Sequence, residues 1–165
     1  MSLIDQVGGG YRVKGAVALP NTAVTQTSNT AASTQDGLTI DRLTLGRRYY
    51  SCKTIVAAAW GAGSSQQTVS LSLNFQHSSD GTSWDNFSTG TVVASVLGST
   101  STGGSTGTTG AATYGTVEQS VGLVGARRYV RMQLPVPTFG DCSSGKTVTV
   151  AGTIVFMGAD ELPAV

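Results

Sequence analysis

Apolar and polar side chains alternate with a period of two through much of the chain after residue 37. The clearest case is TVSLSLNFQ, where Val69, Leu71, Leu73 and Phe75 share one face and Ser, Asn and Gln take the other. This is the period of a β-strand with one face in water. Similar segments lie at residues 38–45, 49–60, 91–97, 113–124, 127–136 and 146–158. The pattern predicts about seven or eight short strands.

Glycine- and serine-rich turns separate these segments, and no segment between them has the period of a helix. Within HSSDGTSW, Asp80-Gly81 supplies the positive φ angles of a tight hairpin turn, and Trp84 with Phe87 begins the returning strand. We therefore predict an all-β fold with little helix, an antiparallel β-sandwich that is jelly-roll-like and spans residues 37–158. Its expected core is Val69, Leu71, Leu73, Phe75, Trp84, Val130, Met132, Val148, Val150, Ile154 and Phe156.

Residues 1–36 contain a short strand-like segment, Tyr11 to Leu19, and a polar stretch from Asn21 to Asp36. We expect them to form an extended N-terminal arm that pairs with the sheet edge of another chain and can be deleted without unfolding the sandwich. The candidate interface residues of this arm are Tyr11, Arg12, Val13, Val17 and Leu19. The small side chains of residues 98–112 predict a flexible surface loop, and residues 159–165 a short tail.

Composition narrows the classes of function. Charged residues make up 12% of the chain and its formal net charge is +1, which gives no electrostatic attraction to nucleic acid or to an anionic membrane. The chain has no run of eighteen apolar residues, a length typical of a membrane-spanning helix. The first fifteen residues, MSLIDQVGGGYRVKG, lack an apolar stretch behind a basic region, so we expect no signal peptide.

Candidate chemistry is sparse. Cys52 and Cys142 form no CxxC pair, and a single histidine, His77, cannot complete a zinc site, so we expect no metal. Buried free thiols are the favoured interpretation of the cysteines, with a disulfide as the alternative. A Ser-His-Asp or Cys-His arrangement would have to use His77, and no sequence feature identifies its nucleophile. We predict that the chain is not an enzyme and takes no cofactor.

One nucleotide-binding pattern is present: residues 140–147, GDCSSGKT, fit GxxxxGK[ST]. A phosphate loop needs a helix after it, because the helix N-terminus holds the phosphates. Here VTVAGTIVF follows with the period of a strand. We therefore interpret residues 140–147 as a β-turn and expect no small-molecule ligand.

Two segments carry a family resemblance, QHSSDGTSW at residues 76–84 and ARRYVRMQL at residues 126–134. They resemble the SxDGxxW hairpin and the RYVR strand of discoidin-like jelly rolls and of small β proteins from tailed bacteriophages. In that pattern Ser79, Asp80, Gly81 and Trp84 form a structural hairpin. The resemblance to the phage proteins implies a decoration, or cement, protein on the capsid surface of the virion, made in the host cytoplasm.

The expected partners are then the major capsid protein and copies of the chain itself, as a dimer or trimer. Two alternatives stay open at this point. One is a tail or head-to-tail connector component of the virion, and the other is a carbohydrate-binding or adhesion module.

Overall fold

The computed structural model describes residues 13–26, 33–46, 48–60, 69–88, 95–96, 113–139 and 146–159. These residues are almost wholly β, with no α-helix among them and a single short 3-10 helix, η1 (Arg42–Leu45). The longer strands are β1 (Lys14–Gln26), β4 (Tyr49–Trp60), β6 (Asn74–Ser78), β9 (Thr113–Gly122), β10 (Tyr129–Leu134) and β12 (Lys146–Ala159). The shorter strands are β2 (Gln35–Asp36), β3 (Ile40–Asp41), β5 (Val69–Leu71), β7 (Asp85–Asn86), β8 (Ser95–Val96) and β11 (Thr138–Phe139).

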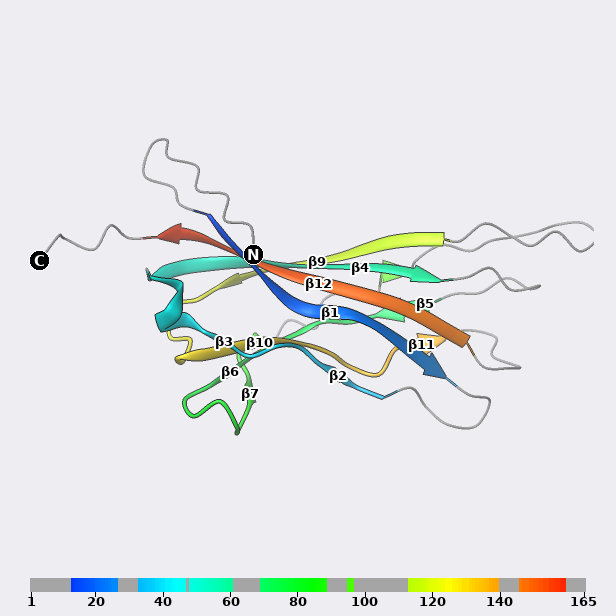
Figure 1. Ribbon diagram of the computed structural model, residues 1–165, viewed down its shortest axis with the longest axis horizontal. Coiled ribbons are helices and arrows are strands. Elements are labelled where there is room, and N and C mark those ends of the chain that lie inside the picture. The colour runs from blue at the N-terminus through cyan, green and yellow to red at the C-terminus, as the bar shows by residue number, and fades with distance from the viewer. Residues whose placement is uncertain are drawn as a thin grey trace, which may run out of the picture.

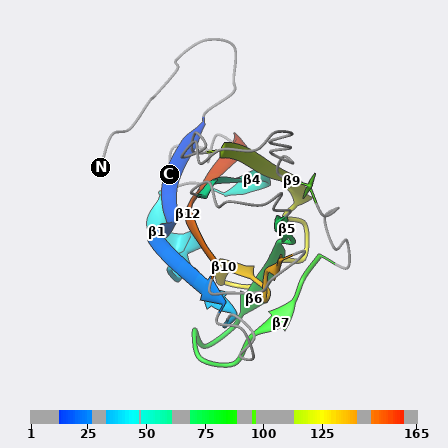
Figure 2. The ribbon, with the colours of Figure 1, turned by 90° about the vertical axis from the view of Figure 1, so that its right-hand side faces the viewer.

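The strands form two antiparallel layers. The first sheet has the order β1-β12-β4-β9. The second layer consists of β2-β10-β6-β7, with β3 also on β10, and of β11-β5-β8. Figures 1 and 2 show the two layers facing each other; in Figure 1, β9 and β4 of the first sheet run along the upper side and β3, β10, β6 and β7 of the second layer along the lower side. Side chains from both inner faces form one apolar core.

The winding of the chain is that of a jelly roll. In the described residues, several short strands of the second layer share one strand position. β2 and β3 both lie beside β10, β5 leads into β6, and β10 leads into β11. β7 pairs with β6 and β8 pairs with β5, so these two also share a position. The second layer thus has four positions, like the first sheet. Along the chain, β1 lies in the first sheet, β2 with β3 in the second layer, and β4 in the first sheet. The positions β5 with β6 and β7 with β8 follow in the second layer. Then β9 lies in the first sheet, β10 with β11 in the second layer, and β12 in the first sheet. Eight strands wound in this order make the two Greek keys of a jelly roll, so the prediction of an antiparallel sandwich is confirmed.

The inner positions of the alternating segments form the core, as the pattern predicts. Nine of the expected core residues are buried: Leu71, Leu73, Phe75, Val130, Met132, Val148, Val150, Ile154 and Phe156. The side chain of Val69 lies outside the described part of the chain. The segment TVSLSLNFQ does not form one strand but divides into β5 and β6.

A glycine on β12 lets the two layers approach closely. Gly152 lies on the inward side of β12, and a Cβ at this position would be 2.7 Å from Met132 Sδ of the opposite layer. The same Cβ would be 3.1 Å from Leu19 Cβ and from Val56 Cγ2. Met132 is completely buried and occupies the space that a larger side chain at position 152 would need.

The prediction of an N-terminal arm outside the core is wrong for Lys14–Gln26. These residues form β1, which pairs with β12 of the same chain from Lys14↔Phe156 to Gln26↔Lys146. Leu19 and Val24 are each only 2% exposed. The register shifts between Val17 and Leu19 and again between Leu19 and Thr22, so the apolar positions of β1 lose the regular period of two. The sequence indicates a strand-like segment from Tyr11 to Leu19, but it does not reveal that the strand continues to Gln26 or pairs within its own chain.

This correction also changes the candidate interface residues. Tyr11 and Arg12 lie outside the described residues, and Leu19 belongs to the core. Val17 is 56% exposed and faces out from the first sheet.

The chain after β2 joins the two layers, because Gly37 N–H donates to Met132 O at 2.8 Å and Leu38 N–H donates to Ala18 O at 2.6 Å.

The segment LTIDRLTL is also not a strand throughout. It begins with β3 and turns into η1 at Arg42. Asp41 caps this helix by accepting from Leu43 N–H at 3.0 Å, and Gly46 ends it at φ +77°. The apolar residues Leu43 and Leu45 fit either element by spacing, so the capping interactions decide the outcome.

The predicted loop at residues 98–112 and the tail after Ala159 lie outside the described residues.

Candidate functional site

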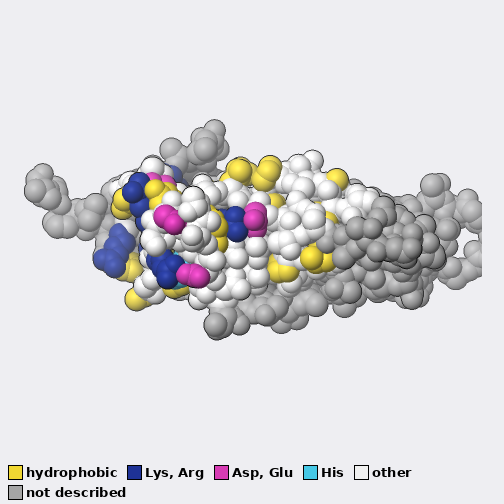
Figure 3. Space-filling view, turned by 90° about the horizontal axis from the view of Figure 1, so that it is seen from below, with side chains coloured by type: hydrophobic (Ala, Val, Ile, Leu, Met, Phe, Trp, Pro, Cys, Tyr) yellow, Lys and Arg dark blue, Asp and Glu magenta, His cyan; other side chains and the backbone are white. Residues whose placement is uncertain are grey.

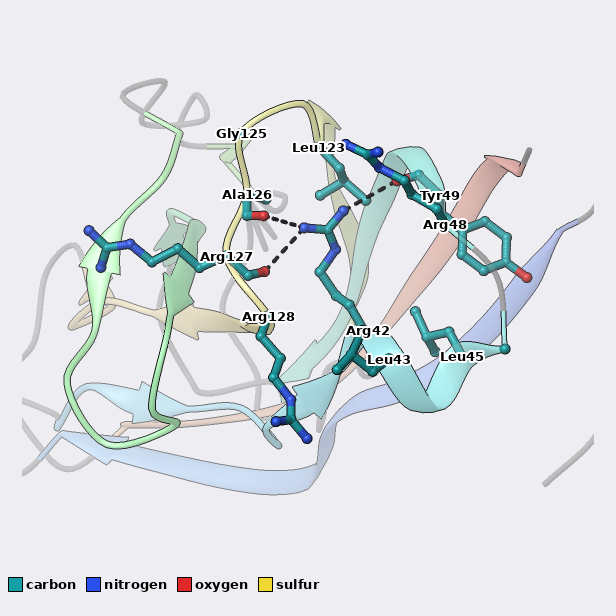
Figure 4. A pocket seen from close by; sticks show the side chains of 11 residues that line it. Arg42, Leu43, Leu45, Arg48, Tyr49, Leu123, Gly125, Ala126, Arg127 and Arg128 are labelled. Atoms are coloured by element: carbon teal, nitrogen blue, oxygen red, sulfur yellow. Dashed lines mark hydrogen bonds between the residues drawn. The ribbon is translucent and has the colours of Figure 1, made fainter. Parts of the chain in front are cut away.

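A cavity of about 550 Å³ lies at one end of the jelly roll, where η1 meets the turn between β9 and β10. Figure 4 shows this cavity, and Figure 1 places η1 at the end of the molecule where β12 finishes. Its lining combines four arginines with apolar side chains: Arg42, Arg48, Arg127 and Arg128, with Leu43, Leu45, Tyr49, Leu123 and Ala126, together with Gly46 and Gly125. We call it the arginine cavity.

Arg42 fixes the shape of the arginine cavity. Its guanidinium donates to the carbonyl oxygens of Ala126 and Arg127 in the turn and to Tyr49 O at the start of β4 (Figure 4). Burial lowers the pKa of Arg42, and repulsion by the positive charge of Arg48 lowers it further. Both effects disfavour the charged form of Arg42, and an anion bound in the arginine cavity would oppose them.

The other two arginines have acidic partners. Arg128 binds Asp41 through two nitrogens, with Nη2 2.7 Å and Nε 3.2 Å from Oδ2, and this hydrogen bonding holds the pKa of Asp41 below its usual range. Arg127 pairs with Asp85 of β7. Arg48 stacks over the Tyr50 ring at 5.7 Å. In the described part of the chain, neither Arg42 nor Arg48 forms an ion pair with a carboxylate.

The predicted hairpin joins β6 to β7 at the same end of the roll, but its loop covers residues 79–84 instead of a tight two-residue turn. Asp80 Oδ1 accepts from the backbone N–H of Thr82 at 2.8 Å and of Ser83 at 2.9 Å. These hydrogen bonds hold the pKa of Asp80 well below its usual range. Gly81 has the predicted positive φ, +78°.

The serine that organises this loop is Ser78, a residue absent from our predicted set, and not the exposed Ser79. Ser78 Oγ accepts from Gly81 N–H at 2.9 Å and is completely buried. The sequence contained a signal for it, because a serine two residues before an aspartate can form this type of turn.

Trp84 is not part of the core, contrary to prediction. It is partly exposed on the outer face of the second layer, where the Arg131 guanidinium stacks over its ring at 4.3 Å. Arg131 also donates to Gln76 at 2.8 Å and pairs with Asp36 at 3.1 Å. Gln133, Asn74 and Asn86 extend this polar network. Charged side chains on the face in Figure 3 gather mainly toward the η1 end.

The outer face of the first sheet has a different chemistry. Its outward positions on β12 and β4 are mostly threonine, alanine, valine and isoleucine, with Ala57 and Ala151 exposed and directly paired. Among the described outward residues on β1, β12, β4 and β9, the charged side chains are Lys53 and Glu118, which pair with each other. This face, which we call the neutral face, is a candidate protein contact surface.

Two side chains that a catalytic site could have used, His77 and Cys52, lie in the described part of the chain. His77 packs on Phe87 with ring centroids 4.8 Å apart, its Nδ1 accepts from Arg127 N–H at 3.4 Å, and partial burial lowers its pKa. Cys52 is a free, fully buried thiol, and burial raises its pKa to about 12. It is therefore protonated at neutral pH and a poor nucleophile. Cys142 lies outside the described residues.

Residues 146–147 of the phosphate-loop pattern open β12, as predicted, and residues 140–145 lie outside the described part of the chain. Within the described residues, no group of three His, Cys, Asp or Glu side chains is placed to hold a metal ion. The described part of the chain also has no helix long and apolar enough to cross a membrane.

The sequence matches no protein-family model and no curated protein. Solved structures do resemble the fold. The VP2 subviral particle of infectious bursal disease virus matches 90% of this chain at a TM-score of 0.50 and 11% identity. T=1 particles derived from the same virus match 90% at a TM-score of 0.46 and 9% identity. The chain spans about a third of those proteins, 33% and 32%. At this identity the likeness of the subviral particle shows a shared jelly-roll fold.

Proposed function

We propose that this chain is a structural protein of a virus particle and acts through contacts with other protein chains. The supporting observation is the complete jelly roll, which resembles VP2 of a viral particle over 90% of this chain. Jelly rolls occur in viral capsid proteins, lectins and cupins, so the fold alone does not decide the function, and the likeness to VP2 is what favours the viral class. The lack of a reactive nucleophile at Cys52 and the packing of His77 against Phe87 favour the structural class over an enzyme.

Within that class, we favour a decoration protein on a bacteriophage capsid. A decoration protein acts through protein contacts alone, which suits a jelly roll with a nearly uncharged outer sheet face. The assignment to tailed bacteriophages depends on the sequence resemblance at residues 76–84 and 126–134.

The neutral face is the favoured contact surface for this role. Interface centres are depleted in charged residues, and this face carries the single pair Lys53–Glu118 among its described residues. Four strands about 4.8 Å apart and about ten residues long cover roughly 600 Å². That area approaches the roughly 800 Å² per partner that a stable interface buries. The outer face of the second layer, with Arg131, Asp36 and Gln76 in a hydrogen-bonded network, is less suited to losing its water.

The test uses particles of the virus that encodes the chain, purified through a density gradient and stripped of the protein. Recombinant chain is added back and occupancy is measured after a second gradient. Thr153→Arg places a charge on the neutral face and should reduce occupancy at least tenfold. Thr82→Arg, in the exposed hairpin loop, is the matched control and should bind as the wild type does. Equal binding of both variants contradicts the assigned face, and failure of the wild type to bind contradicts the decoration role.

The carbohydrate-binding alternative makes a different prediction in the same experiment. A carbohydrate-binding module would be missing from purified particles and would bind a glycan array. A protein found in particles that binds no glycan supports the structural role.

A further inference from the structure

The arginine cavity has unused capacity for an anion. Arg42 and Arg48 both line it and repel each other, and neither forms an ion pair with a carboxylate in the described residues. The three carbonyl contacts of Arg42 use three of the five N–H groups that a guanidinium carries. The remaining N–H groups and the exposed guanidinium of Arg48 can therefore donate to a carboxylate.

The rest of the lining is apolar, which narrows the class of ligand. Leu43 is 69% exposed, although it is a large hydrophobic residue, and Leu45 and Leu123 form more of the wall. A free inorganic anion would leave the Leu43 side chain in contact with water. A short peptide that combines acidic and aliphatic side chains would satisfy both parts of the lining.

A segment of this composition starts beside the cavity. The last residue of β12, Ala159, pairs with Tyr49, which lines the cavity, and paired Cα atoms in antiparallel strands are about 5 Å apart. Residues 160–165, which lie outside the described part, have the sequence DELPAV. Six extended residues reach roughly 20 Å, whereas a cavity of about 550 Å³ is on the order of 10 Å across. Gly158, two residues before this segment starts, has a φ of +66°.

We propose that the arginine cavity is a binding site for an acidic, aliphatic peptide, and that its occupant is residues 160–165 of the same chain. The carboxylates of Asp160 and Glu161 face Arg42 and Arg48. Leu162 covers Leu43, the exposed leucine of η1. The acidic positions come first after β12, at the side of the cavity that Arg48 and Tyr49 form.

The attachment to β12 explains how weak contacts hold this segment. An ion pair at an exposed site contributes little by itself, so a free peptide of this sequence should bind weakly. A short tether gives the attached segment an effective concentration in the millimolar range. The attached segment therefore competes with any free acidic peptide, and neutralising its two carboxylates should make the cavity available.

The experiment uses the full-length chain and a fluorescent synthetic peptide of residues 159–165, ADELPAV, with binding followed by anisotropy. The double variant Asp160→Asn/Glu161→Gln should bind the peptide about tenfold more tightly than the wild type, because its own segment no longer competes. Adding Arg48→Ala to this variant should weaken binding at least fivefold. Arg131→Ala, on the outer face of the second layer, is the matched control and should have no effect.

Circular dichroism and urea unfolding of each variant confirm that the fold persists. The proposal is overturned if the double variant binds no peptide at millimolar concentration, or if Arg48→Ala and Arg131→Ala have the same effect. Sedimentation velocity provides a further check on the occupant. A wild-type dimer that dissociates on Arg48→Ala would mean that a second copy supplies the segment, which contradicts the assignment to the same chain.

Discussion

The close approach of Gly152 to Met132 provides a quantitative test of the packing between the two layers. In Gly152→Ala, the new Cβ would lie 2.7 Å from Met132 Sδ and 3.1 Å from Leu19 Cβ, both shorter than an ordinary contact. Adding a methyl group to a tightly packed core costs about 1–3 kcal/mol. Because domains of this kind are stable by about 5–15 kcal/mol, the variant should fold but unfold at a lower urea concentration.

A double-mutant cycle with Met132→Ala attributes the cost to this contact. Met132→Ala alone leaves a cavity and should cost about 2–5 kcal/mol. In that background Gly152→Ala no longer meets the sulfur atom, so its cost should fall by about 1 kcal/mol or more. Gly122→Ala is the matched control, because a Cβ there has no atom within 4 Å, and it should change stability by less than about 0.5 kcal/mol.

Urea unfolding followed by circular dichroism gives the free energies of unfolding, provided that the m-values stay equal across the four proteins of the cycle. If Gly152→Ala lowers the free energy of unfolding equally in the wild type and in the Met132→Ala variant, the packing described here is refuted. A cost for Gly122→Ala equal to that for Gly152→Ala would refute it as well.

Four further predictions follow from the described contacts. Gly37→Ala should destabilise more than Gly152→Ala in the same urea assay, because its Cβ would lie 2.5 and 2.6 Å from two backbone carbonyl oxygens, which cannot move aside as a side chain can. Cys52, whose pKa burial raises to about 12, should resist iodoacetamide at pH 8 until urea unfolds the chain, as peptide mass spectrometry would show; labelling of the native protein contradicts its burial. Asp80→Asn should lower the urea midpoint at pH 7, and the difference from wild type should shrink as the pH falls below about 4. The folded-state pKa of Asp80 is lowered, so its stabilisation is present above the unfolded pKa and is lost on acidification. A difference that does not depend on pH argues against the assigned hydrogen bonds. Deleting residues 1–26 removes β1 and should abolish cooperative unfolding, whereas a chain that still unfolds cooperatively would restore the interpretation of this segment as a separate arm.

The all-β class and most of the core were predictable from sequence because the central strands alternate regularly. Val130 and Met132 on β10 show this directly, since each is buried and flanked by residues that face the solvent side. The period of two also ruled out a helix after Lys146, which removed the nucleotide-binding interpretation of residues 140–147. In these segments, local sequence and tertiary structure favour the same conformation.

Sequence patterns were misleading where local irregularity or long-range contacts decide the structure. The bulges of β1 hide its inward positions, so its strand-like segment was assigned to an arm that pairs with another chain instead of to the chain's own sheet. Trp84 was assigned to the core because it was expected to cover an end of the sandwich, but Arg131 from a distant part of the sequence provides a partner on the surface. The arginine cavity combines Arg42 and Arg48 with Arg127 and Arg128, which are brought together by the jelly-roll winding and not by their spacing in sequence.

The most direct test of the proposed function is the copy number of this protein in purified virus particles, measured by quantitative mass spectrometry against the major coat protein. A decoration protein that covers the shell should be present in hundreds of copies per particle. A copy number of a dozen or fewer would contradict decoration and indicate a tail or connector component. Absence from particles would contradict the structural role altogether.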